Sequence, residues 1–509
     1  MAERFTRSRF PRSARGCGGK CDETTQTRRA FAEASTMKPT VFDARTGGVL
    51  LHLSSVPGAF GVGDLGPGAY DALAWMARTD LTWWQMLPVG PIGPGDSPYA
   101  STSSFAGEPL FISIDGLVRD RLLPRSALCA APALARGSSR YAAARTAKWP
   151  RFELAFEAFR RKGGLRSNSF KAFARRQRLW LPGWRAFMKD ESGLHAFLQF
   201  AFDAQWSDFK QTAAARGIRL LGDLPIFVSL DSADVLSNPS HFRLDRQGRP
   251  TVVTGVPPDC FSADGQLWGH PHYRWSEHRR TGYRWWIERV RAAVERFDAV
   301  RVDHFIGFFH AFEIPGSATT ARHGVWKRAP GRELLGAMER ALGSLPLIAE
   351  DLGALTPPVV ALRDDFGLPG MKLLHNAFYG DDSGEAPHRH PRHCVCYPGT
   401  HDNDTTVGWW AQLQPAAKAR ARTYMGWDGS DPAAQLNRLA FTSPANTAIV
   451  SMQDALGLGA QARMNLPGTA SGNWHWRLQS RGAASLRPEA ADRLRALALL
   501  TGRARSKAR

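Results

Sequence analysis

The stretch FDAVRVDHF at residues 297–305 decides the fold, because an apolar, strand-like run leads directly into a carboxylate at Asp303. Two later stretches have the same form: LPLIAEDLG (345–353) carries Glu350, and CVCYPGTHDND (394–404) carries Asp402. A parallel α/β barrel collects its catalytic side chains at the C-terminal ends of successive strands. The repeated pattern therefore predicts a barrel enzyme whose acidic groups come from different strands.

Short apolar runs recur along most of the chain and alternate with amphipathic segments. This alternation predicts a parallel sheet built from βα units, and eight runs in series match the (β/α)8, or TIM, barrel of the α/β class. The predicted strands are 47–53, 81–89, 218–228, 298–305, 345–353, 370–378, 393–402 and 447–456.

Two gaps between predicted strands are much longer than the rest. Between the second and third strands, at about 110–215, apolar residues recur at three-to-four spacing, which predicts a mostly helical insertion. Between the third and fourth strands, at about 235–275, the chain is rich in Pro, Gly and aromatic residues, which predicts a long irregular loop near the cleft. We expect a barrel domain at 41–500, a disordered basic leader at 1–40 and a basic tail at 501–509.

Composition excludes several classes of protein. The chain is 43% hydrophobic and 22% charged, and no apolar run approaches the roughly 20 residues of a membrane helix, so we expect a soluble protein without a membrane partner. The six cysteines are sparse and lack paired zinc-site spacing, which predicts free thiols in the cytoplasm and no metal. The Gly-rich segment at 89–101 fits neither a P-loop nor a dinucleotide fingerprint, so no cofactor is expected.

The net charge of +20 raises the question of a nucleic-acid partner. Residues 1–40 hold nine basic and four acidic side chains (9 − 4 = +5), and residues 480–509 hold eight and two (8 − 2 = +6), so the ends carry +11 of the +20. The rest is spread over the body without a basic stripe interleaved with aromatic residues. We therefore expect a solvated basic surface and no nucleic-acid role.

The carboxylates suggest a division of chemical labour. Residues two apart in a strand project to the same side, so Arg301 favours the ionised form of Asp303 and suits it to be a nucleophile. Glu350 follows an apolar run without a neighbouring cation, and a dry site raises the pKa of a carboxyl and suits it to donate a proton. Two such carboxyls about 5–5.5 Å apart form the apparatus of a retaining glycosidase. Asp402, beside His401, would stabilise positive charge developing at the anomeric carbon.

A single Asp at a strand end is more often a helix cap or a partner in an ion pair than a catalyst. Three carboxylates in consecutive βα units, flanked by Arg301, His304 and His401, make coincidence a poor explanation. The pattern favours carbohydrate chemistry.

The chain resembles the amylomaltase family, the 4-α-glucanotransferases or disproportionating enzymes of glycoside hydrolase family 77. The resemblance runs from about Arg45 to Leu478 and is dense and ordered. It rests on the motifs GVLLHLSSVPGAFGVGDLG, GDSPYASTSSFAGEPL, GDLPIFVSLDSADV, GRPTVVTGVPPDCFSADGQLWGHPHYRW, RVDHFIGF, IAEDLG, FGLPGMKLL, GTHDNDTTVGWW and QDALGLGAQARMNLPGTASGNWHWRL.

This resemblance implies roles for individual residues. Asp303 of the RVDHF motif matches the nucleophile, Glu350 of AEDLG the general acid/base, and Asp402 of GTHD the transition-state stabiliser. Tyr99 and Trp268 match positions that contact glucan residues, and both lie in polar, Gly-rich loops. The remaining positions that match cleft-lining motifs of the family are Asp96, Ser97, Asp223, Arg301, His304 and His401.

The chain departs from the family pattern in three places. Cys260 stands in GVPPDCF where relatives commonly carry Tyr, which places acceptor preference in doubt. Ile306 replaces an Arg that is frequent after the DHF triplet, and the helical insertion is abbreviated around 189–197.

The sequence thus predicts a cytoplasmic, retaining 4-α-glucanotransferase that needs no cofactor and uses α-1,4-glucans as donor and acceptor. Two alternatives stay open at this point. One is an α-1,4-glucan hydrolase, in which water discharges the intermediate. The other is a catalytically silent protein that binds glucan or nucleic acid.

Overall fold

Eight parallel strands form the central sheet of the structure, a computed structural model that describes residues 40–258, 263–353, 355–380, 383–469, 471–482 and 484–505. The strands are β1 (Thr46–Leu50), β2 (Trp83–Gln85), β3 (Arg219–Pro225), β6 (Ala299–Asp303), β9 (Leu347–Ala349), β10 (Gly370–Leu373), β11 (Cys394–Tyr397) and β12 (Thr447–Ser451). Their order is β10-β11-β12-β1-β2-β3-β6-β9. The Ala349 N–H donates to the Pro369 carbonyl at 2.9 Å and so joins the two ends of the sheet. The predicted (β/α)8 barrel is confirmed.

The strands are shorter than the apolar runs that predicted them. The run at 81–89 contributes only Trp83–Gln85 to the sheet, although Met86, Leu87 and Val89 are also buried. Apolar patterning reports burial, which continues after the chain has left the strand ladder. The residues beyond each ladder build the loops at the C-terminal mouth of the barrel.

The barrel interior follows the two-residue period of its strands. Trp83, Leu221, Ala299 and Ile348 point inward and pack with side chains from the other strands. Their sequence neighbours, such as Trp84, pack outward in the larger core between the sheet and its helices. Because alternate residues share a side, the inward row through Ala299 continues to Arg301 and Asp303 at the mouth.

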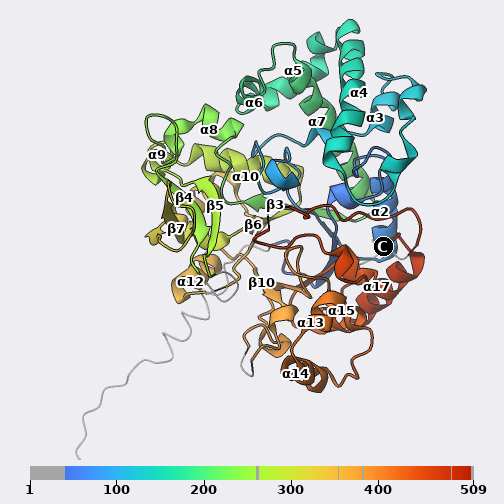
Figure 1. Cartoon of the computed structure of the whole chain (residues 1–509), viewed down its shortest axis with the longest axis vertical. Coiled ribbons are helices and arrows are strands. Elements are labelled where there is room, and N and C mark those ends of the chain that lie inside the picture. Colours follow the sequence, from blue (N-terminus) through green and yellow to red (C-terminus); the bar gives the residue numbers. More distant parts are fainter. Residues whose placement is uncertain are drawn as a thin grey trace, which may run out of the picture. The chain divides into compact units, whose positions relative to one another are not determined.

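The segment between β2 and β3 is mostly helical, as predicted. It contains α3 (Ile114–Arg119), α4 (Tyr141–Arg161), α5 (Asn168–Arg176), α6 (Leu181–Phe187) and α7 (Leu194–Ala215), which lie together at the top of Figure 1. Lys148 of α4 is fully buried beside Asp64, which lies in the turn before α2 (Pro67–Arg78). The Lys148 Nζ donates to Asp64 Oδ2 at 2.5 Å and to the Leu110 and Ile112 carbonyls at 2.6 and 2.9 Å. This buried ammonium anchors the helical insertion to the loop that follows β1.

The loop predicted as irregular between the third and fourth barrel strands lies where expected but contains regular structure. Besides the short helices α8 (Ala233–Ser237) and α9 (Trp275–Arg280), it forms strands β4 (Val252–Val256) and β5 (Gln266–Pro271). These pair with β7 (His310–Pro315) and β8 (Val325–Arg328) in an antiparallel sheet of order β5-β4-β7-β8. The prediction of an irregular loop was wrong because β7 and β8, which complete this sheet, come from beyond β6 in the sequence.

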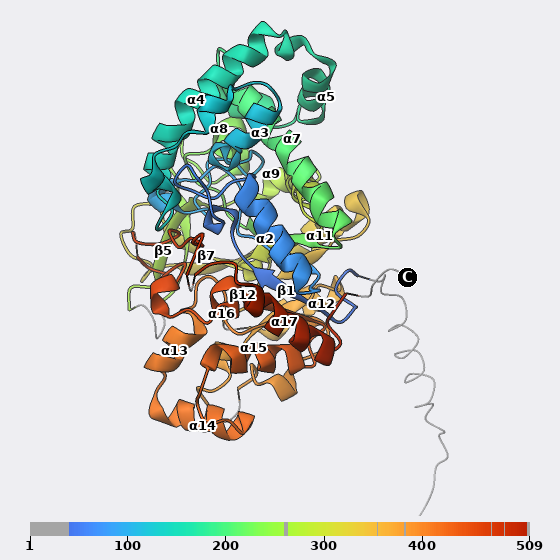
Figure 2. The same ribbon diagram turned by 90° about the vertical axis from the view of Figure 1, so that its right-hand side faces the viewer.

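The other helices cover the outside of the barrel: α10 (Arg284–Arg296), α11 (Gly331–Leu342), α12 (Pro357–Asp365), α13 (Thr406–Gln412), α14 (Pro415–Met425), α15 (Pro432–Thr442), α16 (Met452–Ala455) and α17 (Pro488–Leu500). Figure 2 shows α17 beside α2, where Arg78 and Asp492 form an ion pair at 2.7 Å. Among the described residues, no helix is both long and apolar enough to cross a membrane.

Residues from Thr40 onward cluster into one compact unit, and the predicted leader at 1–40 lies almost wholly outside the described residues. Residues 501–505 do not form the free basic tail that we expected. The Arg503 side chain is buried, and its guanidinium donates to five backbone carbonyls, those of Thr46, Phe441, Ser443, Ala445 and Asn446. This arginine therefore belongs to the folded barrel, and residues 506–509 lie outside the described part of the chain.

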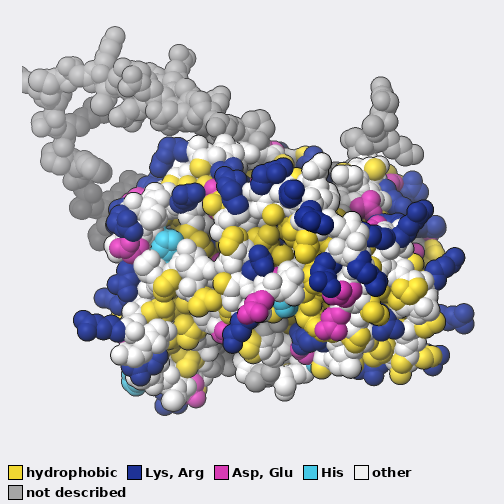
Figure 3. Space-filling view, turned by 90° about the horizontal axis from the view of Figure 1, so that it is seen from above, with side chains coloured by type: hydrophobic (Ala, Val, Ile, Leu, Met, Phe, Trp, Pro, Cys, Tyr) yellow, Lys and Arg dark blue, Asp and Glu magenta, His cyan; other side chains and the backbone are white. Residues whose placement is uncertain are grey.

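Basic side chains are dispersed over the face that Figure 3 shows, which is the face on the side of the helical insertion. Asp and Glu side chains lie among them, and ion pairs such as Arg176–Asp203 (2.8 Å) and Arg160–Glu157 (2.9 Å) join the two kinds. On this face the charge is mixed, as in a solvated surface.

We predict that Lys148→Met lowers the free energy of unfolding by about 3–5 kcal/mol, because Asp64 then stays buried without its cation. Urea unfolding followed by circular dichroism measures the change. The matched control is Lys171→Met on the exposed surface of α5, which should change stability by less than about 0.5 kcal/mol. A loss in Lys148→Met no larger than that of the control would contradict the anchoring role.

Candidate active site

A cleft of about 860 Å³ opens at the C-terminal ends of the barrel strands. Most of the site residues predicted from the sequence line it, namely Ser97, Tyr99, Trp268, Arg301, Asp303, His304, Glu350, His401 and Asp402. These residues come from five separate stretches of the chain, so the fold brings together what the sequence separates.

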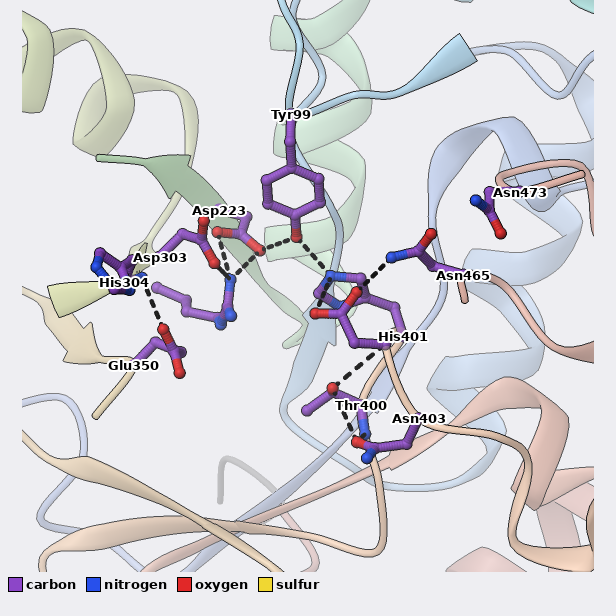
Figure 4. Close-up of polar contacts among 12 residues, drawn as sticks. Tyr99, Asp223, Asp303, His304, Glu350, Thr400, His401, Asn403, Asn465 and Asn473 are labelled. Atoms are coloured by element: carbon purple, nitrogen blue, oxygen red, sulfur yellow. Dashed lines mark hydrogen bonds and ion pairs between the residues drawn. The ribbon is translucent and has the colours of Figure 1, made fainter. Parts of the chain in front are cut away.

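Asp303 is the last residue of β6 and is held by Arg301, two residues earlier. The Arg301 Nη1 lies 3.0 Å from Asp303 Oδ1 and donates to both carboxylate oxygens of Asp223, at 3.0 and 2.8 Å. The Asp223 side chain is fully buried, and that of Arg301 is only 4% exposed. Burial alone would lower the pKa of Arg301, but Asp223 and Asp303 together keep it well above its usual value. A permanent cation therefore lies beside the Asp303 carboxylate. Figure 4 shows Asp303 and Asp223 close together at this point.

Glu350 directly follows β9 and accepts hydrogen bonds from two backbone N–H groups. The His304 N–H donates to Glu350 Oε2 at 2.7 Å, and the Leu352 N–H donates to Oε1 at 3.2 Å. His304 reaches this position with φ = 51°, in the left-handed region. Burial raises the pKa of Glu350 to about 7, and the charge of Asp303 adds to this effect against the opposing influence of Arg301. Glu350 can therefore hold a proton near neutral pH, as its apolar sequence context predicted.

Asp402 lies in the loop after β11 and is held by the segment 463–465. The Asn465 Nδ2 donates to Asp402 Oδ1 at 2.6 Å, and the Arg463 Nη2 donates to the Asp402 carbonyl at 2.9 Å. The Asn465 N–H also donates to the His401 carbonyl at 3.1 Å. The orientation of the Asp402 carboxylate is thus set by residues more than sixty positions away. The sequence motifs did not point to Asn465 or Arg463, because no local spacing connects them with Asp402.

Tyr99 connects the two halves of the site. Its hydroxyl donates to Asp223 Oδ2 at 2.8 Å and lies 2.8 Å from His401 Nε2, so its oxygen is placed to accept from that ring (Figure 4). Its aromatic ring also stacks on His401, with the ring centroids 5.3 Å apart. Tyr99 lines the cleft, as predicted, and it also joins the Arg301 cluster to the loop of Asp402.

Trp268 and His304 form the wall of the cleft beside Glu350. The Trp268 ring meets His304 edge to face, with the ring centroids 4.9 Å apart. Burial lowers the pKa of His304 to about 4 against the charge of Asp303, so this imidazole is neutral near pH 7. An aromatic face beside neutral hydrogen-bonding groups suits a sugar, which presents both C–H surface and hydroxyls.

Two predicted residues, Asp96 and Asp223, are not among the residues that line the cleft. Asp223 is buried beneath Tyr99 and Arg301, and Asp96 faces His475, whose Nε2 lies 3.1 Å from Asp96 Oδ2. Each carboxylate instead pairs with a side chain of the protein, Asp223 with Arg301 and Asp96 with His475, and a substrate-binding role for these two residues stays a prediction.

Two positions where the chain departs from the family pattern have different outcomes in the structure. Ile306 is buried and is not among the residues that line the cleft. Cys260 lies outside the described residues. Cleft residues to which the sequence motifs gave no role include His270, Asn376 and Asn473.

Comparison with known proteins gives consistent results over nearly the whole chain. The model of glycoside hydrolase family 77, described as 4-alpha-glucanotransferase, matches residues 51–192 and 183–483. The 4-alpha-glucanotransferase of Thermus thermophilus is 42% identical over an alignment that covers 90% of this chain and 99% of that protein. The 4-alpha-glucanotransferase of Synechocystis is 42% identical over 86% of this chain and 94% of its own length. The structure of an amylomaltase from Streptococcus agalactiae in complex with acarbose superposes with a TM-score of 0.84 at 32% identity, covering 91% of this chain and all of that one.

We predict that Glu350 titrates near pH 7, whereas exposed glutamates titrate at about 4.3. Carbon-13 NMR of carboxyl-labelled glutamate measures this, with Glu350→Gln to assign the signal. In Asp303→Asn the pKa of Glu350 should fall, because the removed negative charge had raised it. The described electrostatics would be contradicted if Glu350 titrated in the same pH range as the exposed glutamates. They would also be contradicted if the pKa of Glu350 were unchanged in Asp303→Asn.

Proposed function

The chain belongs to glycoside hydrolase family 77 and is a 4-alpha-glucanotransferase, and we propose that Asp303, Glu350 and Asp402 carry out its glucan transfer. The observation that carries the assignment is the contrast between two carboxyls in one cleft. Asp303 faces the permanent cation of Arg301, whereas burial raises the pKa of Glu350 to about 7. Unequal environments of this kind assign the roles of nucleophile and acid.

The first step breaks the donor glycosidic bond. Glu350 gives its proton to the glycosidic oxygen while a carboxylate oxygen of Asp303 attacks the anomeric carbon. The carbon–oxygen bond breaks, the reducing-end fragment leaves with a 4-hydroxyl, and the remaining glucan forms an ester with Asp303. Asp402 stabilises the positive charge that develops at the anomeric carbon, and its hydrogen bond from Asn465 fixes the orientation of its carboxylate.

The second step reverses the first with a new partner. Glu350, now ionised, accepts the proton of an acceptor 4-hydroxyl, whose oxygen attacks the anomeric carbon and releases Asp303. Two displacements retain the α configuration, and the new bond is again α-1,4. The chemistry is supplied by carboxyl groups of the chain.

The substrates that we propose are α-1,4-glucans as both donor and acceptor. The aromatic edge of the cleft at Trp268 and the neutral His304 beside it support a sugar ligand. We also propose a cytoplasmic location, which is supported by the buried free thiols of Cys394 and Cys396 on β11.

Incubation of the pure protein with maltotriose should give glucose together with maltooligosaccharides longer than the substrate. Asp303→Asn should lose turnover by a factor of about 10³ or more, because no nucleophile then forms the ester. Chromatography of the products measures turnover and product length in both proteins. Protection of Asp303→Asn by glucan against thermal unfolding tests whether the variant still binds substrate. Reducing ends that increase without longer products would instead indicate hydrolysis.

The rate should also fall as pH rises through neutrality. Glu350 must be protonated for the first step, and since its pKa is about 7, kcat/KM for maltotriose should decrease about tenfold per pH unit well above that value. With α-maltosyl fluoride as donor, whose leaving group departs without a proton, this decrease should weaken. A profile that stays flat through neutrality with maltotriose would exclude Glu350 as the acid.

A further inference from the structure

His270 lies on the wall of the cleft that the antiparallel sheet builds. It stands two residues after Trp268 in β5, and Gly269 between them has φ = 79° where the β4–β5 register shifts. His270 and Trp268 both line the cleft. The Trp268 ring packs against His304, and the backbone N–H of His304 holds Glu350. His270 therefore belongs to the wall of the cleft beside Glu350.

The imidazole of His270 has a buried nitrogen that no described residue satisfies. Its Nδ1 is shielded from solvent and has no hydrogen-bond partner within the part of the chain that the structure describes. The Nε2 of His401, by comparison, is occupied by the Tyr99 hydroxyl at 2.8 Å. The Nε2 atom of His270 is not among these buried, unpartnered atoms, so it is the ring nitrogen that a ligand in the cleft can reach.

The charge state of His270 fits a neutral ligand. Burial lowers its pKa to about 4, although the charge of Asp303 opposes this. Near neutral pH the ring therefore carries one N–H donor and one acceptor nitrogen. A sugar hydroxyl both donates and accepts, so it can pair with the Nε2 atom in either neutral form of the ring.

The position of this wall indicates which of the two reacting sugars His270 would meet. Figure 4 shows Glu350 and His304 on one side of Asp303, and His401 and Asn465 on the other. The stabiliser side holds the sugar that becomes attached to Asp303. The Glu350 side meets the sugar whose oxygen Glu350 protonates in the first step and deprotonates in the second, which is the leaving or acceptor sugar.

We propose that His270 binds a hydroxyl of the acceptor sugar and thereby favours glucan over water as the partner in the second step. This inference rests on the proposed function, and it concerns acceptor selection within that reaction. Loss of the contact should reduce transfer without slowing formation of the glycosyl-enzyme.

The test compares three variants at one position. His270→Leu removes both nitrogens, His270→Asn keeps a polar atom near the place of Nδ1, and His270→Gln keeps one near Nε2. Each is given α-maltosyl fluoride as donor and labelled maltose as acceptor. Fluoride release in the first turnover reports the first step. The ratio of labelled transfer product to the unlabelled maltose that hydrolysis of the donor releases reports the second. His323→Ala, an exposed histidine after β7, is the matched control.

We expect His270→Leu to lower the ratio of transfer to hydrolysis about three- to tenfold, the effect of one lost hydrogen bond to a neutral group. His270→Gln should retain more of the ratio than His270→Asn, because it keeps a polar atom near Nε2, and the first-turnover release of fluoride should match that of the parent protein in all three. The control should leave both readouts unchanged.

An unchanged ratio of transfer to hydrolysis in His270→Leu would overturn the proposal. A decrease in the first-turnover release of fluoride as large as the decrease in that ratio would also overturn it. If His270→Leu fails to fold by circular dichroism, the comparison of His270→Asn with His270→Gln decides, and equal ratios in these two variants overturn it. Absence of any transfer product from the parent protein would instead overturn the proposed function.

Discussion

A buried guanidinium is the constraint on which the site depends. Arg301 projects into the barrel mouth with almost no exposure, and a charge in such a place is tolerated only when it is paired and hydrogen-bonded. Asp223 and Asp303 supply that pairing from adjacent strands, in the register that places Asp223 opposite Arg301. Tyr99 then bonds Asp223 and contacts His401, so the same cluster extends to the loop of Asp402. The ion cluster therefore positions both Asp303, the proposed nucleophile, and the His401 support of Asp402, the proposed stabiliser.

The difference between Asp303 and Glu350 follows from this arrangement. Both carboxyls line one cleft, but the inward row of β6 places the cation directly beside Asp303, whereas Glu350 is held by backbone N–H groups at the edge of β9. Burial and the neighbouring negative charge then outweigh the hydrogen bonds and raise the pKa of Glu350. A parallel barrel achieves this contrast simply, because each strand delivers its terminal residue to the same mouth from a different environment.

Structure outside the barrel completes the cleft. The antiparallel sheet brings Trp268 and His270 to the wall beside Glu350, while the segment after β12 brings Asn465 to Asp402. The two walls are thus made by different segments outside the barrel strands, one beside Glu350 and one beside Asp402. Such an arrangement allows acceptor selection to vary while the carboxylates of the barrel stay in place. The likeness to amylomaltases over most of the chain is consistent with a common barrel carrying the chemistry.

The sequence by itself determined the barrel, the helical insertion, the presence of Asp303, Glu350 and Asp402 in one cleft, and the direction of the Glu350 pKa. These features depend on apolar period and on neighbours within a few residues, such as Arg301 two positions before Asp303. Only the tertiary structure decided that the Pro- and Gly-rich loop becomes a sheet, that Asp96 pairs with His475, that Arg503 is buried and that Asn465 holds Asp402. Each of these contacts joins residues tens to hundreds of positions apart. Their partners are chosen by how the strands and loops meet in space, and no local pattern of residues records that choice.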